Sequence, residues 1–323
     1  HHTQLGMLLA AAIGLRAIGV MDTLSGRVAL MALPAEEYIE IEYRNQLRRQ
    51  GKIEFLAGKS EFIKLGAFDD VDMAMMTHVD DRKESSAYFG VGGTFNGMLA
   101  KLVQFTGVSA HAGSEPHRGV NALNAAILGL SAIHAQRETF RDEDSIRVHP
   151  IITKGGGAVS AVPDDVRIET FVRGRTMDAV IDASRKVDRA LKSGAIAMGT
   201  SVSITTTPGY LPLHHELNFQ NLHAANAMNL VGEANVTQRG HESGGSDMGD
   251  LSNIMPITHP FVVSASGQSH GVDFLVEDYD LAVLTSAKAM VATVIDLLGN
   301  GALRAAEIKS SYNAPLTKKQ YLE

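Results

Sequence analysis

Residues 98–113, MLAKLVQFTGVSAHAG, decide how this chain is organised. The apolar run 98–105 has the length and composition of a β-strand, and the loop 108–113 leads into an Ala/Leu-rich amphipathic segment typical of a helix. Further segments continue the pattern as strand, strand, helix and strand. The order βαββαβ is that of the split-βαβ, ferredoxin-like unit. The predicted elements are 98–105, 119–136, 145–153, 166–173, 177–195 and 200–206.

We therefore expect residues 95–208 to form an inserted lid domain, and residues 1–94 with 209–323 to form a second domain around it. The outer segments contain the apolar strand runs and helical patterns typical of an α/β fold. The runs 27–33 and 73–78 are almost continuously apolar, which suits a mostly parallel sheet covered on both faces. The remaining expected elements are a helix at 3–18, a glycine-rich linker at 89–97, helices near 213–230 and 279–298, and a strand near 257–264.

Bulk properties exclude several classes of protein. A length of 323 residues favours two domains. The net charge is −7 and no basic cluster is interleaved with aromatic residues, so nucleic acid is an unfavourable partner. There is no cysteine, which leaves His, Asp and Glu as strong metal ligands and agrees with a cytoplasmic location. The apolar residues 1–20 are interrupted by Arg16 and predict a buried helix, not a membrane segment.

Three polar side chains follow or end predicted strands. Glu36 and Glu37 come directly after the run 27–33, and two adjacent carboxylates repel each other unless a cation or a proton-transfer task is nearby. His78 ends the second apolar run, at the sheet edge where open α/β folds bind ligands. The alternatives are an acidic surface loop for the carboxylates and a structural role for His78.

Polar residues also lie in three predicted loops. Gly244 to Asp247 and Ser266 to His270 combine polar groups with glycines, which let a backbone approach a ligand closely. Asp247 is expected to support a site through other residues. His111 lies in the loop between the first strand and first helix of the inserted domain. Ordinary surface turns are the alternative for all three loops.

Taken together, these segments resemble one family. The acidic pair is followed by 108–113 with Gly-Val-Asn-Ala-Leu at 119–123, then by Ile-Ile-Thr-Lys-Gly-Gly at 151–156 and Val-Pro-Asp at 162–164. Their order and spacing resemble the aminoacylase/carboxypeptidase metallopeptidases (peptidase family M20), in particular the amidohydrolase branch with aminobenzoyl-glutamate and auxin-conjugate hydrolases. The resemblance covers nearly the whole chain.

The resemblance implies a role for each matching residue. Glu36 matches the general base and His111 the lid histidine that steadies the oxyanion in the partner subunit's active site. Metal ligands are implied at Glu37, His78 and His270, and substrate-binding residues at Arg173 and Asn121. The resemblance further implies two divalent ions, with zinc the first expectation and manganese or cobalt the alternatives, and a homodimer formed through the lid domain.

Two departures from the family pattern bear on these expectations. His2-Thr3 resembles the end of the first metal-binding motif, so its ligands are expected before His1. Ser160 stands where asparagine is usual. The predicted function is hydrolysis of the amide bond in an N-acyl amino acid, dipeptide or aryl-amide. The alternatives are a non-catalytic homologue or subunit that binds a small carboxylate, and an unrelated α/β protein.

Overall fold

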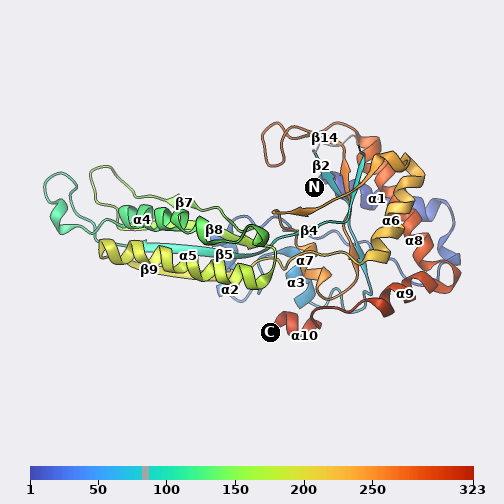
Figure 1. The fold of residues 1–323 in the computed structure, drawn as a ribbon, viewed down its shortest axis with the longest axis horizontal. Helices are drawn as coiled ribbons and strands as arrows, with labels where there is room; N and C mark the ends of the chain where they lie inside the picture. The colour runs from blue at the N-terminus through green and yellow to red at the C-terminus, as the bar shows by residue number, and fades with distance from the viewer. Residues whose placement is uncertain (82–86) are drawn as a thin grey trace.

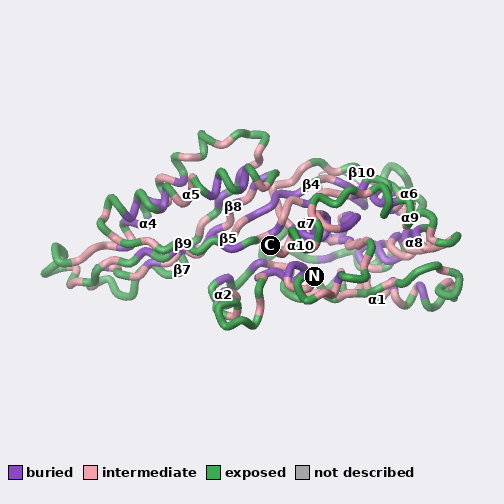
Figure 2. The backbone as a smooth tube through the Cα atoms, turned by 90° about the horizontal axis from the view of Figure 1, so that it is seen from below, coloured by how far each residue is buried: buried purple, intermediate pink, exposed green. Residues whose placement is uncertain are grey.

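The computed structural model describes residues 1–81 and 87–323, which form an elongated lobe and an α/β lobe (Figure 1). The elongated lobe is an antiparallel sheet of order β6-β8-β5-β9, with β7 also paired to β8. Helices α4 and α5 cover one face of this sheet (Figure 2). The elements are β5 (Gly97–Thr106), α4 (Ala122–Ala135), β6 (Arg147–Val148), β7 (Ile151–Lys154), β8 (Asp165–Gly174), α5 (Met177–Met198) and β9 (Ser201–Pro208).

Alternating burial along β8 explains this packing. Every second residue is buried, so Val166, Ile168 and Val172 face the two helices while their neighbours face outward. Helices α4 and α5 cross closely because Gly194 has no side chain, since a Cβ there would lie 2.3 Å from the carbonyl oxygen of Ala125. The predicted βαββαβ order is confirmed. The strand expected at 145–153 is divided into β6 and β7.

The α/β lobe contains short strands in several ladders. The main sheet has the order β10-β3-β13-β2, in which β13 is parallel to β2 and antiparallel to β3. Two-stranded ladders join β1 to β12, β4 to β11 and β14 to β15. The strands are β1 (Ala74–Met75), β2 (His78–Asp80), β3 (Phe89–Val91), β4 (Thr94–Phe95), β10 (Val236–Gln238), β11 (His241–Glu242), β12 (Ile257–Thr258), β13 (Phe261–Val263), β14 (Ala265–Ser266) and β15 (Leu275–Val276).

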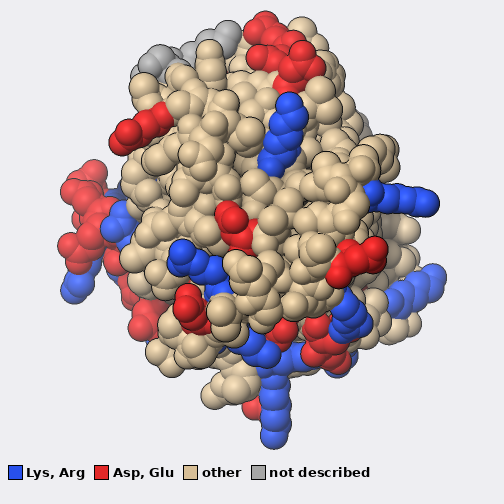
Figure 3. Space-filling view, turned by 90° about the vertical axis from the view of Figure 1, so that its right-hand side faces the viewer, with Lys and Arg blue, Asp and Glu red and all other residues tan. Residues whose placement is uncertain are grey.

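Helices enclose these strands on both sides. Helices α1, α6 and α8 lie together on one side, whereas α3 and α7 lie nearer the elongated lobe (Figure 1). Acidic and basic side chains are interspersed on the face shown in Figure 3. The helices of this lobe are α1 (His2–Ala17), α2 (Ile41–Arg49), α3 (Gly58–Lys64), α6 (Leu217–Val231), α7 (Met248–Ser252), the π-helical η6 (Asp280–Thr285), α8 (Ser286–Leu298), α9 (Leu303–Ser311) and α10 (Lys318–Leu322).

One helix of the described residues, 280–298, passes a length and hydropathy test for a membrane span. Core helices of soluble proteins pass the same test, so it is weak evidence for a membrane. This helix packs against both α1 and α6. The N-terminal segment forms α1, as predicted, with Met7, Ala11 and Leu15 buried along one side.

Four sequence-based predictions for this lobe are corrected by the structure. The run 27–33 enters no strand ladder, although Met31 and Leu33 pack against the core. The runs 73–78 and 257–264 are each divided into two short strands, so His78 begins β2 and does not end a strand. The glycine-rich segment 89–97 contains β3 and β4 and is not a linker. Apolar composition predicted burial here, but a strand also requires a neighbouring partner for its backbone.

The chain crosses between the lobes twice, and the two crossings pair with each other. Phe95 and Leu213 form an antiparallel bridge, and the amide of Met98 donates to the carbonyl of Tyr210 at 2.7 Å. Beyond these residues β5 and β9 continue as neighbours in the sheet. We call this pair of crossing segments, 95–98 and 208–213, the connecting ribbon.

Candidate metal and active site

The acidic pair lies on a sharply turned loop between α1 and α2. Ala35 has φ +59°, an uncommon conformation for a residue with a side chain. The amide of Gly58 donates to the carbonyl of Ala35 at 3.1 Å. A Cβ at Gly58 would lie 1.8 Å from the carbonyl oxygen of Pro34, so only glycine fits this approach. The start of α3 therefore fixes the loop that carries Glu36 and Glu37.

Two histidines from other elements reach this loop. His1, directly before α1, places Nε2 3.5 Å from Oε2 of Glu36 and 3.7 Å from Oε1 of Glu37. The ring of His78 lies edge-on to that of His1, with ring centres 5.4 Å apart. The Nδ1 atom of His78 is 2.7 Å from the carbonyl oxygen of Val79, an arrangement that leaves Nε2 as the free ligand atom.

The donor set fits a divalent cation. Among the described residues, His1, Glu36 and Glu37 can each offer a ligand atom with all three atoms within 4.8 Å of one another. Imidazole nitrogen and carboxylate oxygen are the ligands of zinc sites that lack cysteine. Burial lowers the pKa of His78, which favours the neutral form that binds metal. Of the predicted residues, the structure brings Glu36 and Glu37 into this cluster and places His78 beside it, in contact with His1.

His1 is the ligand candidate that the sequence did not reveal. The sequence suggested that His2-Thr3 forms the end of the first metal-binding motif. In the structure the side chain of His2 contacts Tyr279, with Nε2 3.1 Å from the hydroxyl oxygen. His270 lies outside the cluster, on the exposed loop between β14 and β15, with φ +63°. Its role as a metal ligand stays a prediction.

A buried ion pair lies behind Glu36. The Nζ atom of Lys59, at the start of α3, is 2.5 Å from Oδ1 of Asp247, and both side chains are almost fully buried. The backbone amide of Lys59 also donates to Asp247, at 3.2 Å. Burial raises the pKa of Asp247, and Lys59 opposes this effect. The pair thus joins Asp247 to the end of α3 that holds the acidic loop, and a role for Asp247 in supporting the site stays a prediction.

Burial also acts on Glu36 itself. It raises the pKa of Glu36 from 4.5 to about 7, with Asp247 contributing in the same direction and Lys59 in the opposite direction. A carboxyl group with a pKa near neutrality is matched to proton transfer at that pH.

The predicted lid residues lie at opposite ends of the elongated lobe. Arg173, on β8, pairs with Met98 next to the connecting ribbon. Burial lowers the pKa of Arg173, while Tyr210 and Glu37 oppose that shift, so the guanidinium lies within electrostatic range of Glu37. His111 lies in the loop that follows the other end of β5. Ten residues of strand separate these ends by about 30 Å.

The imidazole of His111 has a defined arrangement of hydrogen bonds. Its Nδ1 accepts from the backbone amides of Gly113 and Ser114, both at 3.1 Å. Nδ1 is therefore the unprotonated nitrogen, and Nε2–H is the donor that faces outward. Asn121 caps α4, since its side chain accepts from the amide of Asn124 at 3.0 Å. A role for Asn121 in substrate binding stays a prediction.

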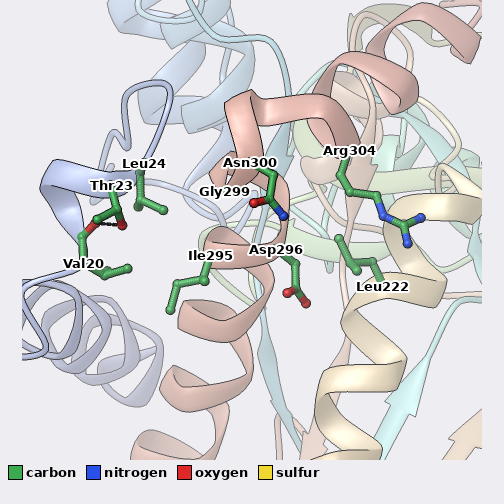
Figure 4. Close-up of a pocket in the computed structure, with 9 residues that line it drawn as sticks. All are labelled: Val20, Thr23, Leu24, Leu222, Ile295, Asp296, Gly299, Asn300 and Arg304. Carbon is green, nitrogen blue, oxygen red and sulfur yellow. Dashed lines mark hydrogen bonds between the residues drawn. The ribbon is translucent and has the colours of Figure 1, made fainter.

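A cavity of about 540 Å³ lies apart from these residues (Figure 4). It is formed where the C-terminal end of α8 meets α6 and the turn after α1. Its lining residues are Val20, Thr23, Leu24, Leu222, Ile295, Asp296, Gly299, Asn300 and Arg304. None of them belongs to the cluster around Glu36 and Glu37, so this cavity does not mark the candidate active site.

Comparisons with known proteins agree with this geometry. Residues 93–198 match the family model described as the peptidase dimerisation domain of M20 enzymes. The chain is 25% identical to the Xaa-Arg dipeptidase of Mus musculus over 328 residues, which cover 97% of the chain and 69% of that protein. The chain thus resembles the M20 peptidases over nearly its whole length, and residues 93–198 match their dimerisation domain. These relatives are hydrolases that cleave amide bonds.

Two solved structures share the fold. An aminobenzoyl-glutamate utilization protein from Klebsiella pneumoniae superposes with a TM-score of 0.67 at 17% identity, covering 91% of this chain and 68% of that one. A dinuclear metal binding peptidase of the M20 family from Bacillus subtilis gives a TM-score of 0.62 at 15% identity, covering 92% and 71%. The predicted α/β architecture with an inserted dimerisation domain is confirmed.

Proposed function

We propose that the chain hydrolyses the amide bond of an N-acyl amino acid, dipeptide or aryl-amide with the help of two divalent ions, zinc being the first candidate. The observation that carries the proposal is the convergence of His1, the adjacent pair Glu36 and Glu37, and His78 from three separate segments. His1, Glu37 and His78 would hold metal, and His270 would join them from its loop. When bound, such ions polarise a substrate carbonyl and lower the pKa of a water molecule.

Glu36 is the proposed general base. Its carboxylate takes a proton from the attacking water and returns it to the leaving amine. Three features support this role: the side chain lies in the cluster, its pKa is raised to about 7 mainly by burial, and the turn at Ala35 fixes its direction. Glu37 is more exposed, with 45% of its side chain accessible against 19% for Glu36. The two neighbouring carboxylates thus have different environments and different proposed tasks.

His111 is proposed to act on the active site of a second copy of the chain. Its Nε2–H is oriented as a donor for the oxyanion that forms when water attacks the amide. Within one chain, the length of β5 separates His111 from the connecting ribbon beside the acidic pair. A homodimer formed through the elongated lobe, which the dimerisation-domain match supports, supplies the missing contact.

Arg173 is proposed to bind the substrate carboxylate. The guanidinium lies over the ring of Phe171, 5.2 Å from its centre, and within electrostatic range of Glu37. A planar guanidinium recognises a carboxylate through two parallel hydrogen bonds. This placement favours substrates with a free carboxylate on the amine side of the scissile bond. The name of the mouse relative, Xaa-Arg dipeptidase, describes a substrate of this kind.

The proposal is tested by a hydrolysis screen. N-acyl amino acids, dipeptides and aryl-amides are incubated with the protein in the presence of zinc, manganese or cobalt, and the released amine is measured. Metal-dependent release of amine supports the enzyme. A protein that binds small carboxylates yet releases no amine with any of the three metals, and that holds no metal by elemental analysis, is instead the non-catalytic homologue.

Glu37→Gln is expected to weaken metal binding. The substitution keeps the shape of the side chain but removes the negative charge that a cation requires. We expect the affinity for zinc to fall by at least about 10- to 100-fold, because even the loss of a residue that hydrogen-bonds to a metal ligand has an effect of this size. Zinc bound after dialysis is measured by elemental analysis, with Glu40→Gln, an exposed residue of the same loop, as the control. Equal zinc content in both variants would remove Glu37 from the site.

His111→Ala is expected to lower kcat by about 10²–10³-fold, the usual loss for one oxyanion donor. Its action in trans is tested by mixing this variant with Glu36→Gln. A mixed dimer then contains one site with both residues intact, so random exchange of subunits restores about a quarter of wild-type turnover. Turnover that stays at the level of the separate variants would place His111 in the site of its own chain or outside the reaction.

A further inference from the structure

The loop that carries Glu36 is joined to the connecting ribbon by two tyrosines that bond in opposite directions. The hydroxyl of Tyr210, on the ribbon, donates to the backbone carbonyl of Glu36. The hydroxyl of Tyr38, on the loop, donates to the carbonyl of Pro208 at 2.6 Å. Their rings pack edge-on, with centres 5.8 Å apart. We call this pair the tyrosine clasp.

We propose that Tyr210 is a positioning residue, which holds the backbone of Glu36 and thereby makes the direction of the general base depend on the connecting ribbon. The proposal rests on the proposed function for the role of Glu36. Tyr210 itself does not reach the substrate in this proposal, and it acts through the Glu36 carbonyl.

The turn at Glu36 requires such support. Ala35 has a positive φ, which costs free energy for a residue with a side chain and persists only where its surroundings hold it. Three bonds hold the carbonyls of this loop: the amide of Gly58 binds that of Ala35, the hydroxyl of Tyr210 binds that of Glu36, and Nη1 of Arg44 binds that of Glu37 at 2.8 Å. Without the second bond, the peptide that follows Glu36 loses its fixed orientation, and the carboxylate turns with it.

The other end of the clasp is equally constrained. The amide of Gly209 donates to the carbonyl of Met98 at 3.2 Å, and a Cβ at Gly209 would lie 2.6 Å from the side chain of Met98. The ring of Tyr210 is only 6% exposed and packs beside Gly245, where a Cβ would approach it to 3.2 Å. Tyr210 therefore cannot shift independently of the ribbon.

The clasp also reaches the elongated lobe. The ring of Tyr38 packs edge-on against Phe171 of β8, with ring centres 5.7 Å apart, and the guanidinium of Arg173 lies over the ring of Phe171, 5.2 Å from its centre. The ring of Tyr38 thus contacts both Phe171 of the elongated lobe and Tyr210 of the connecting ribbon. The position of the general base and that of the proposed carboxylate-binding arginine are thus linked through one packed cluster.

Tyr210→Phe tests the proposal, with Tyr38→Phe as the matched control. Both substitutions remove one hydroxyl from a ring of the same cluster with nearly equal exposure, 6% and 5%. Only Tyr210→Phe frees the carbonyl of Glu36. We expect it to lower kcat by about 10- to 100-fold through misplacement of the base, with KM and zinc content within twofold of wild type. The control is expected to lower kcat by less than threefold, on the order of the effect of a neutral packing change.

Amide hydrogen exchange provides a readout that does not require turnover. Tyr210→Phe is expected to raise the exchange rate of the segment 34–40 in both zinc-loaded and metal-free protein, because the carbonyl of Glu36 loses its bond while those of Ala35 and Glu37 keep theirs. Equal kcat losses in the two variants, or unchanged exchange in 34–40, would overturn the positioning role. A wild-type protein without turnover would overturn the proposed function instead, and the exchange measurement would still decide the role of Tyr210.

Discussion

Glu36→Gln is expected to lower kcat/KM by about 10²–10⁴-fold, the contribution typical of a general acid–base group. Glutamine keeps the shape of the side chain in the cluster with His1 and Glu37 but cannot accept the proton of the attacking water. Because Glu37 and His78 retain their donor atoms, the zinc content is expected to stay near that of the wild type. Turnover of the substrate found in the screen and elemental analysis of the dialysed protein measure the two effects.

Glu40→Gln is the control for this prediction. Glu40 precedes α2 on the same loop and is exposed. The substitution therefore makes the same chemical change at a residue outside the cluster. Its turnover is expected to equal that of the wild type. Retained turnover in Glu36→Gln would remove Glu36 as the base, whereas loss of zinc along with turnover would instead make Glu36 a metal ligand.

The elongated lobe could be predicted from the sequence because its signals are local. In β8 every second residue is buried, a pattern that indicates a strand. In α5 a long amphipathic pattern runs from a threonine N-cap to a glycine C-cap, which indicates a helix. The boundaries of β5, β8 and β9 agree with prediction to within two residues. Although β5 pairs with β8 and β9 far along the chain, the long strands β5 and β8 show their own burial pattern before a partner is known.

The α/β lobe was less predictable because its strands depend on partners far along the chain. His78 in β2 pairs with Phe261 in β13, more than 180 residues later. The run 27–33 is as apolar as a buried strand, but no described strand lies beside it to accept its backbone bonds.

The candidate site shows the same division between local and distant information. Glu36 and Glu37 were predicted because two adjacent carboxylates repel each other unless a cation or a proton-transfer task is nearby. His78 was predicted because it ends an apolar run. The part played by His1 arises only from the packing of α1 against β2, which brings a chain-terminal residue beside His78. The tyrosine clasp likewise joins residues that are 170 and 174 positions apart. No spacing in the sequence encodes either contact.

Lys59→Met is expected to lower the free energy of unfolding by about 3–5 kcal/mol, because it leaves the buried carboxylate of Asp247 without its partner. Methionine keeps most of the length of the side chain, so the loss reports the missing charge more than a cavity. Urea unfolding followed by circular dichroism measures it, with a chelator present so that metal binding does not contribute. Lys64→Met is the control on the same helix, since the pair of Lys64 with Glu54 is exposed and worth about 0–1 kcal/mol.

The loss in Lys59→Met is also expected to depend on pH. Burial already raises the pKa of Asp247 and Lys59 is the group that opposes it, so removing the lysine raises that pKa further. The folded variant then binds a proton that the unfolded chain has released, and its stability falls as the pH rises through this range. The deficit relative to wild type should therefore be smaller at pH 5 than at pH 8. A deficit that is equal at both values, or no larger than that of Lys64→Met, would show that the Lys59–Asp247 pair does not hold the start of α3, and with it the turn at Glu36, in the way inferred from its burial.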